Sequence, residues 1–244
     1  MTIRESRLGR IVVPESLPAG IFLFWTTRDF DGHLHGGGAE AIRETIREEF
    51  GVETELATCQ QTHGALVVRA KGGGSGWCEH AGCDALHTAQ RGLALGIKVA
   101  DCLPLSLVEP AAGVVANIHS GWRGSVAGIT EETLRALVSE SLITPGLAHG
   151  WLGPSIRQCC FEVGQEVIAQ FSARAGVDVH VDSSRGVRPH FDLAGFTRDR
   201  LREAGIPDSH IHDSGLCTRC EGSIFHSYRR DGAGAGRNLA VIGR

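Results

Sequence analysis

Three residues suited to metal binding or nucleophilic chemistry each lie beside a run of apolar residues. His63 precedes the run ALVV, Cys102 follows an apolar approach in KVADCLPLSLV, and His119 ends the run GVVANI at 113–118. Zinc binds thiolate and imidazole tetrahedrally, and a catalytic zinc keeps three protein ligands and one open position. One cysteine and two histidines fit that set. Their separations of 39 and 17 residues are unlike short metal motifs, so spacing alone indicates the site only weakly.

The residues after His119, SGWRG, form a turn that suits an anion. Gly121 and Gly124 allow the backbone to turn sharply and to approach a ligand closely. A helix starting near Ser125 would direct free N–H groups and a partial positive charge at the site, with Arg123 beside them. The alternative for Arg123 is an ordinary surface residue.

A second interpretation of the same residues, as a hydrolase, needs no metal. The Cys102 thiolate could act as a nucleophile on an amide or ester, with His119 or His63 as the base. Resistance of activity to chelators, together with covalent trapping of the metal-free thiol, would favour this Cys-His hydrolase.

The remaining cysteines include two close pairs, CTRC at 217–220 and the adjacent Cys159 and Cys160. A structural zinc site is one interpretation of them. A C-x-x-C pair normally needs a second pair of similar spacing, and adjacent cysteines rarely bind one tetrahedral ion. Packed free thiols are therefore the prediction for Cys217, Cys220 and the adjacent pair.

Composition excludes several classes of function. The formal net charge is −4 and the basic residues are scattered, which disfavours binding to nucleic acid or to a membrane surface. The N-terminal residues resemble no signal peptide, and no apolar run approaches the length of a membrane span. We expect a cytoplasmic protein whose partners are small molecules. The sequence gives no indication of oligomeric state.

The pattern of apolar residues predicts an α+β fold. Four-residue spacing indicates a helix over 39–50, and further helices are expected over 125–138, 164–175 and 192–204, the last with Asp192 as N-cap. Short runs rich in branched residues indicate strands at 11–13, 21–25, 65–68, 93–99, 113–118 and 239–243. Because strands and helices do not alternate strictly, we predict a single domain, residues 1–244, of mixed β-sheets flanked by helices.

Several segments together resemble one known family. They are QTHG at 61–64, ADCLPL at 100–105, HSGWRG at 119–124, WLGPSIRQCCFEVG at 151–164, CTRC at 217–220 and FHSYRRDG at 225–232. In this order they are similar to the laccase-domain, or polyphenol oxidase, family, also described as zinc-containing purine nucleoside phosphorylases. The resemblance covers the chain from about residue 59 onward.

The resemblance implies both a site and an activity. It implies a metal held by His63, Cys102 and His119, and a catalytic role for Arg230. It also implies zinc-dependent cleavage of purine nucleosides (adenosine, inosine, guanosine and methylthioadenosine) by phosphate, giving the free base and ribose 1-phosphate, with accompanying adenosine deamination. The implied fold is similar to that of cysteine deamidase toxins. On this hypothesis zinc activates an oxygen nucleophile, and Arg230 positions phosphate or stabilises the developing charge.

The N-terminal part departs from the family pattern. Family members follow the strand corresponding to IFLFWTTR with R-x-G-G and a longer loop, whereas TTRDFDGHLHGGG here runs almost directly into a helix. Arg28 stands where the family arginine is expected and, with Arg123, is the predicted phosphate-binding pair.

The older family name suggests a third interpretation, a copper-dependent oxidase of phenols. Copper outcompetes zinc at most sites of this kind, so copper binding in vitro would not identify the native metal. Zinc is the predicted cofactor.

Overall fold

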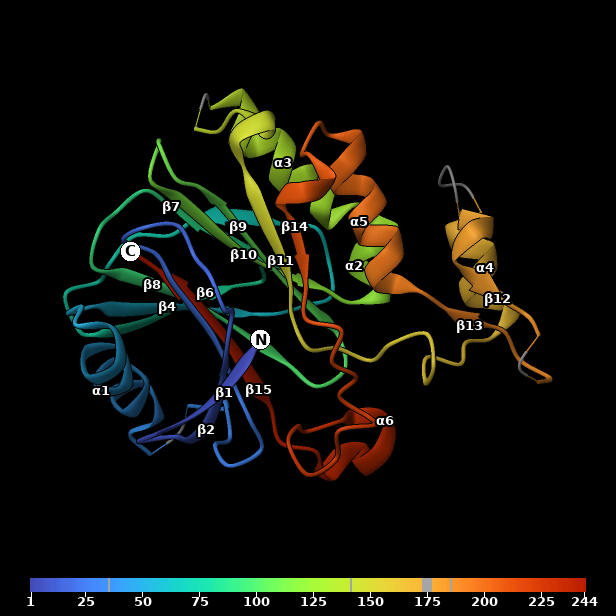
Figure 1. Ribbon diagram of the computed structural model, residues 1–244, viewed down its shortest axis with the longest axis horizontal. Coiled ribbons are helices and arrows are strands. Elements are labelled where there is room, and N and C mark those ends of the chain that lie inside the picture. Colours follow the sequence, from blue (N-terminus) through green and yellow to red (C-terminus); the bar gives the residue numbers. More distant parts are fainter. Residues whose placement is uncertain (35, 141, 173–176, 185) are drawn as a thin grey trace.

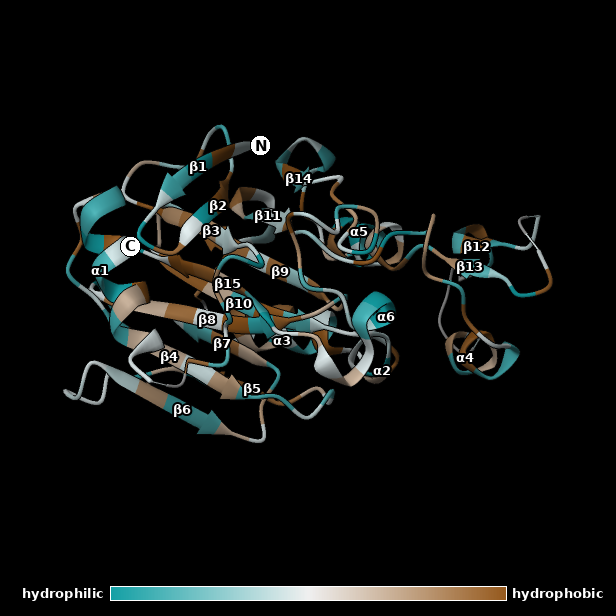
Figure 2. Ribbon diagram, turned by 90° about the horizontal axis from the view of Figure 1, so that it is seen from below, coloured by the Kyte–Doolittle hydropathy of each residue, from teal (hydrophilic) through white to brown (hydrophobic). Residues whose placement is uncertain are grey.

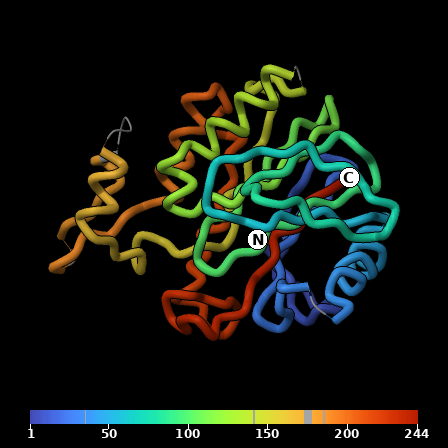
Figure 3. The backbone as a smooth tube through the Cα atoms, turned by 180° about the vertical axis from the view of Figure 1, so that it is seen from behind, coloured from blue at the N-terminus to red at the C-terminus, as the bar shows by residue number. Residues whose placement is uncertain are grey.

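The computed structural model describes residues 1–244 except 35, 141, 173–176 and 185. In this described part, seven strands form the first sheet. Their order is β1 (Thr2–Ser6), β2 (Gly9–Val13), β3 (Phe22–Thr26), β15 (Asn238–Gly243), β8 (Leu93–Val99), β4 (Glu55–Gln60) and β6 (Trp77–Ala81). Neighbours from β1 to β8 are antiparallel, while β4 pairs in parallel with both β8 and β6. The C-terminal strand β15 therefore lies inside the sheet, as the red end of the tube in Figure 3 shows.

The second sheet carries much of the predicted site. Its order is β14 (Ile211–Asp213), β11 (His149–Leu152), β9 (Leu103–Glu109), β10 (Val114–Ser120), β7 (Ala85–Thr88) and β5 (Val67–Arg69). The central strands are antiparallel, and β14 and β5 join the edges in parallel. Both large sheets are mixed. A two-stranded sheet of β12 (Val181–Asp182) and β13 (His190–Phe191) lies apart from them with α4, at one end of the molecule (Figure 1).

Six α-helices lie within the described residues, and four of them cover the outer faces of the two sheets. The six are α1 (Gly38–Phe50), α2 (Trp122–Ala127), α3 (Ile129–Ser139), α4 (Gln165–Phe171), α5 (Leu193–Glu203) and α6 (Tyr228–Asp231). Short 3-10 helices occupy Pro145–Leu147, Val177–His180, Asp208–His210 and Gly232–Gly234. Helix α1 packs on the first sheet, whereas α2, α3 and α5 lie over the second (Figure 1). Within the described residues, no helix has both the length and the apolar character to cross a membrane.

Three apolar cores follow from these layers. One lies between the sheets and includes Trp25, Ile97, Val115 and Trp151, with contributions from both sheets. The other two lie between each sheet and its helices. In Figure 2 central strands such as β15 are brown, whereas much of α1 and α6 is teal. The predicted α+β architecture of mixed sheets flanked by helices is confirmed, while the similarity to cysteine deamidase toxins stays a prediction.

The predicted helices and strands lie where the structure has them, but their first and last residues differ. Asp192 caps α5 by accepting a hydrogen bond from the N–H of Gly195 at 2.9 Å, as predicted. The helix expected over 125–138 begins earlier and divides in two, because Gly128 has a left-handed φ of 88°. The helix expected over 164–175 is observed to Phe171, and the end of that range lies partly outside the described residues. The strands at 11–13, 21–25, 65–68, 93–99, 113–118 and 239–243 all appear, with small shifts at their ends.

Proline did not prevent pairing beside the site. Pro104 lies within β9 and opposes His119 of β10, so the segment after Cys102 is a buried strand. Proline at the start of a strand still accepts through its carbonyl group. Here that carbonyl accepts from the N–H of Gly153 at 2.9 Å. The strand pair β9–β10 consequently fixes the positions of Cys102 and His119 relative to each other.

Candidate metal centre and its cavity

The structure brings His63, Cys102 and His119 together. One ligand atom from each residue lies within 4.8 Å of those of the other two. The two imidazole rings meet edge to face with their centroids 4.7 Å apart. His119 is buried at the end of β10, His63 lies on an exposed loop after β4, and Cys102 is partly buried just before β9. Three chain segments far apart in sequence thus converge on one point.

A buried carboxylate, Asp84, organises both histidines. Its Oδ1 lies 2.7 Å from Nδ1 of His119, and the same oxygen accepts the backbone N–H of His63 at 2.9 Å. Its Oδ2 accepts the N–H groups of Thr62 and Gly64. Sequence reasoning missed Asp84, because a single acidic residue before a short strand is an ordinary signal. A carboxylate on the second nitrogen of a histidine fixes its tautomer and orients the ring, as in many metal sites.

The loop that carries His63 is held at both ends. Gln61 pairs with both backbone groups of Lys98, donating to the carbonyl at 2.7 Å and accepting from the N–H at 2.9 Å. His63 itself has a left-handed φ of 60°, which is uncommon for a residue with a side chain. The hydrogen bonds to Asp84 on either side hold the backbone in this conformation. The QTHG segment is therefore a preformed turn that aims the His63 ring at Cys102 and His119.

Cys102 follows a second left-handed residue, Asp101, whose φ is 87°. The Asp101 carboxylate is buried and accepts from the Thr218 hydroxyl and from the N–H of Arg229, each at 2.6 Å. Strain of this kind costs on the order of 1–3 kcal/mol and persists where surrounding contacts enforce it. The C-terminal segment thus holds the turn that presents the Cys102 sulfur.

Gly121 leaves the space that the cluster needs. A Cβ atom at this position would lie 2.8 Å from the sulfur of Cys102 and 3.3 Å from Cδ2 of His63. Gly124 has a similar role, since a Cβ there would lie 3.0 Å from the carbonyl oxygen of Gly64. The close approach predicted for both glycines is present. The atoms near Gly121 belong to Cys102 and His63, and the atom near Gly124 belongs to the loop that carries His63.

The electrostatics of the cluster favour a thiolate. Burial by itself would raise the pKa of Cys102, but the charge of His119 and hydrogen bonds to both imidazoles bring it down to about 6. Burial would lower the pKa of His119, yet Cys102 and Asp84 raise it to about 9. Burial opposes ionisation of Asp84, and hydrogen bonds from His119 and backbone N–H groups hold its pKa at about 2. Thiolate is the form of cysteine that binds metal and attacks electrophiles.

The donor set fits a metal ion. Because Nδ1 of His119 is hydrogen-bonded to Asp84, Nε2 is the atom of that ring that can bind a metal ion. One thiolate and two imidazoles within 4.8 Å of one another match a three-ligand zinc site with one open position. The same donors could also hold copper.

A cavity of about 680 Å³ opens over the cluster. A volume of this size accommodates a small organic molecule. Its apolar wall includes Ile156, Phe161 and Leu193, while Trp122 and Arg123 lie beside the cluster on α2. The Arg123 guanidinium stacks over the Trp122 ring at 4.3 Å, and it has no carboxylate partner among the described residues. The predicted placement of Arg123 beside the site is therefore observed.

Two other predicted arginines do not line this cavity. Arg28 donates to the carbonyl of Gly222, and Arg230 has its guanidinium engaged with the Asp231 carboxylate and the carbonyls of Phe225 and Thr218. The arginines that line the cavity from the C-terminal segment are Arg229 and Arg237, which sequence reasoning missed. Arg229 and Arg230 are adjacent in the short helix α6, so their side chains point in different directions. The YRRDG segment does reach the cavity, but the arginine that it contributes there is Arg229. The catalytic role of Arg230 stays a prediction.

This combination defines a class of protein: an α+β fold with a candidate metal centre of two histidines and one cysteine in a cavity lined by several cationic side chains. Residues 38–244 match the family model described as "Multi-copper polyphenol oxidoreductase laccase", and the chain belongs to that family.

Curated relatives are named for nucleoside chemistry. A purine nucleoside phosphorylase of Deinococcus radiodurans is 41% identical over 189 residues, covering 78% of this chain and 70% of the relative. Adenosine deaminase RL5, from an unknown prokaryotic organism, is 36% identical over 211 residues, covering 83% and 80%. The protein is accordingly an enzyme of nucleoside processing.

Solved structures share the whole fold. The crystal structure of YlmD from Geobacillus stearothermophilus superimposes with a TM-score of 0.83 at 29% identity, covering 93% of this chain and 92% of that one. The Bacillus licheniformis hypothetical protein YfiH superimposes with a TM-score of 0.87 at 23% identity, covering 99% and 98%, and at that identity shows the fold alone.

Proposed function

We propose that the chain catalyses zinc-dependent phosphorolysis of purine nucleosides to free base and ribose 1-phosphate, with adenosine deamination as an accompanying activity. The observation that carries the proposal is the cavity that contains His63, Cys102 and His119 together with cationic side chains. The names of the relatives support the same chemistry.

The cavity lining offers groups suited to each half of the reaction. Ile156, Phe161 and Leu193 offer an apolar wall suited to a flat purine base. Arg123 and Arg229 offer planar guanidinium groups, each able to donate two parallel hydrogen bonds to phosphate. An apolar wall with a few convergent charged groups is typical of a small-molecule site.

His63, Cys102 and His119 would hold the zinc ion, whose Lewis acidity would promote attack by an oxygen nucleophile. Asp84 orients the His119 ring by accepting a hydrogen bond from its Nδ1–H, and it keeps His63 in place by accepting one from the His63 backbone N–H. Arg123 would bring phosphate to the cluster and stabilise the charge that develops as the base leaves. The apolar residues of the lining would limit the water in the cavity and so favour phosphate over water as the acceptor.

The direct test is incubation with adenosine, with and without phosphate, after the zinc and copper of the purified protein have been measured. We expect zinc at the cavity cluster, and adenine whose appearance depends on phosphate, with a smaller amount of inosine. Inosine alone would replace phosphorolysis with deamination, and the absence of both products would overturn the proposal.

A second candidate, the Cys-His hydrolase, has one observation in its favour. Cys102, His119 and Asp84 form a chain of thiol, imidazole and carboxylate of the kind that activates a nucleophile. This candidate predicts activity that survives chelators and is abolished by iodoacetamide. The metal-centre hypothesis predicts that bound zinc protects Cys102 from iodoacetamide until the zinc is removed.

A further inference from the structure

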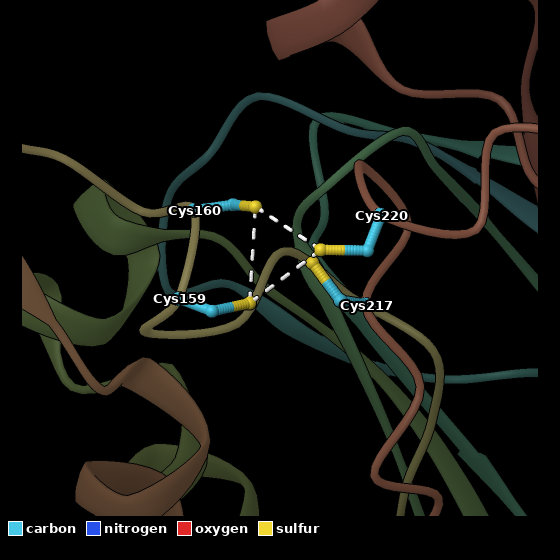
Figure 4. A group of neighbouring side chains, drawn as sticks. All are labelled: Cys159, Cys160, Cys217 and Cys220. Carbon is cyan, nitrogen blue, oxygen red and sulfur yellow. Dashed lines mark hydrogen bonds between the residues drawn. The ribbon is translucent and has the colours of Figure 1, made fainter.

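Four cysteines outside the cavity site form a compact sulfur cluster. The sulfurs of Cys159 and Cys160 lie 3.7 Å apart, and that of Cys220 lies 3.7 Å from the first and 3.3 Å from the second. The sulfur of Cys217 completes the group, with all four within 4.8 Å of one another. Figure 4 shows the four side chains converging from two separate segments. None of them forms a disulfide.

The two segments are fixed against each other by backbone hydrogen bonds. Ser155 forms a parallel bridge with Cys217, in which its N–H donates to the carbonyl of Leu216 and its carbonyl accepts from Thr218 at 3.0 Å. The turn from Cys217 to Glu221 closes through a 2.9 Å bond between the Cys217 carbonyl and the Glu221 N–H. The sulfurs are therefore positioned by the fold.

The spacing of the sulfurs matches a single tetrahedral ion. With zinc–sulfur bonds near 2.3 Å, neighbouring sulfurs of a regular tetrahedron lie about 3.8 Å apart. The separations among the sulfurs of Cys159, Cys160 and Cys220, 3.3–3.7 Å, are close to this value, and the Cys217 sulfur lies within 4.8 Å of all three. Sequence alone favoured packed thiols, because the second pair that CTRC requires is distant in the chain and consists of adjacent residues.

Hydrogen-bond donors lie around two of the four sulfurs, while burial raises the pKa of Cys159 and the Cys160 sulfur raises that of Cys220. Burial would raise the pKa of Cys217, but backbone N–H groups of Arg157, Cys220 and Arg219 point at its sulfur and lower it. The Arg219 side chain donates to the sulfur of Cys160. Hydrogen bonds from backbone N–H groups and a nearby guanidinium stabilise the negative charge that four thiolates share.

We propose that Cys159, Cys160, Cys217 and Cys220 bind a second zinc ion that has a structural role and is separate from the cavity site. Four sulfurs in a tetrahedral arrangement select zinc or iron, and four protein ligands leave no open position for a substrate. None of the four cysteines lines the cavity over His63, Cys102 and His119.

The ion would cross-link the two segments that form one wall of that cavity. The Arg229 side chain donates to the carbonyls of Cys160 and Glu162, at 3.4 and 2.9 Å. Thr218 donates to Asp101, the residue before Cys102. Binding at the sulfur cluster would therefore stabilise the positions of Arg229 and Asp101 without taking part in the reaction.

The test is metal content per chain in matched cysteine variants, expressed with added zinc and purified under reducing conditions. Cys220→Ser and Cys159→Ser should each lose one equivalent of zinc relative to the parent. Cys220→His, which restores a zinc ligand, should keep that equivalent. Cys78→Ser is the matched control, because Cys78 is a partly buried cysteine outside both clusters, and it should keep the parent value.

A spectroscopic readout remains decisive if a serine variant fails to fold. In Cys102→Ser, which disrupts the cavity cluster, X-ray absorption of the remaining zinc should show four sulfurs at about 2.3 Å. Equal zinc in the parent and Cys220→Ser would overturn the proposal. So would fewer than three sulfurs around the remaining zinc, iron in its place, or a disulfide among the four in anaerobically purified, zinc-free protein. These results do not depend on nucleoside cleavage, so this site and the proposed activity can fail separately.

Discussion

Two groups of candidate metal ligands, found among the residues that the structure describes, differ in ways that match different tasks. His63, Cys102 and His119 supply three mixed ligands at the base of a cavity. Cys159, Cys160, Cys217 and Cys220 supply four sulfurs and lie outside the cavity lining. An incomplete ligand set leaves a position for substrate, whereas a complete one serves to hold chain segments together. The ligand count, more than the ligand type, separates a reactive centre from a structural one.

The two clusters are also supported differently. A buried carboxylate, Asp84, orients the histidines of the first through hydrogen bonds to a ring nitrogen and to the loop backbone. Backbone N–H groups and Arg219 surround the second. A negative charge behind imidazole ligands increases their basicity, and donors around thiolates disperse negative charge. Each environment therefore complements the charge of its own ligands.

Cys102→Ser should have the largest effect. Replacing the only thiolate of the cavity cluster should reduce phosphorolysis of adenosine to background and remove the zinc bound there, while zinc at the four-cysteine cluster remains. Product analysis and metal content measure the two effects, and Cys78→Ser is the matched control. Retention of both zinc and full activity would contradict the ligand assignment.

Gly121→Ala should come next. The added methyl group would lie 2.8 Å from the sulfur of Cys102, so the cluster must shift. A displacement of about an ångström near reacting groups costs on the order of 10²-fold in rate. Gly146→Ala is the control, because a Cβ there meets no neighbouring atom within 4 Å. Equal kcat/KM in the two variants would show that the glycine does not protect the cluster.

Asp84→Asn should weaken the first cluster alone. The amide keeps the shape of the side chain but removes the charge behind His119, and loss of such a partner lowers metal affinity by about 10–100-fold. Competition with a chelator measures that affinity at the cavity site. Asp208→Asn, which removes a surface partner of Arg198, is the control. An unchanged affinity would leave Asp84 with a purely structural role.

Arg229→Met and Arg230→Met form a matched pair with the smallest expected change. Because Arg229 lines the cavity, its loss should raise KM for phosphate about tenfold or more, as expected for a lost charged hydrogen bond. Arg230 bonds to Asp231 and backbone carbonyls, so its loss should lower Tm and affect KM less. A larger kinetic loss in Arg230→Met would restore the catalytic role predicted from the sequence.

Much of the fold was predictable because buried strands and amphipathic helices leave local patterns. The run LALGIKV is β8 as predicted, and Asp192 begins α5 through its side chain. The break at Gly128 has a local cause, a left-handed glycine that ends a helix, and was missed. The pairing of Pro104 was not predictable, because it depends on a partner on another strand. The same limit hid Asp84, whose role arises only where the loop after β4 meets the end of β10.

The sequence by itself determined which residue types were present for chemistry and that three of them end or precede strands. Only the tertiary structure decided that these three share one point and that Arg229, with Arg230 turned away, lines the cavity. It also decided that two distant cysteine pairs form one cluster. The physical reason is that strand formation is governed by local periodicity, whereas a ligand set depends on the packing of segments that are far apart in the sequence.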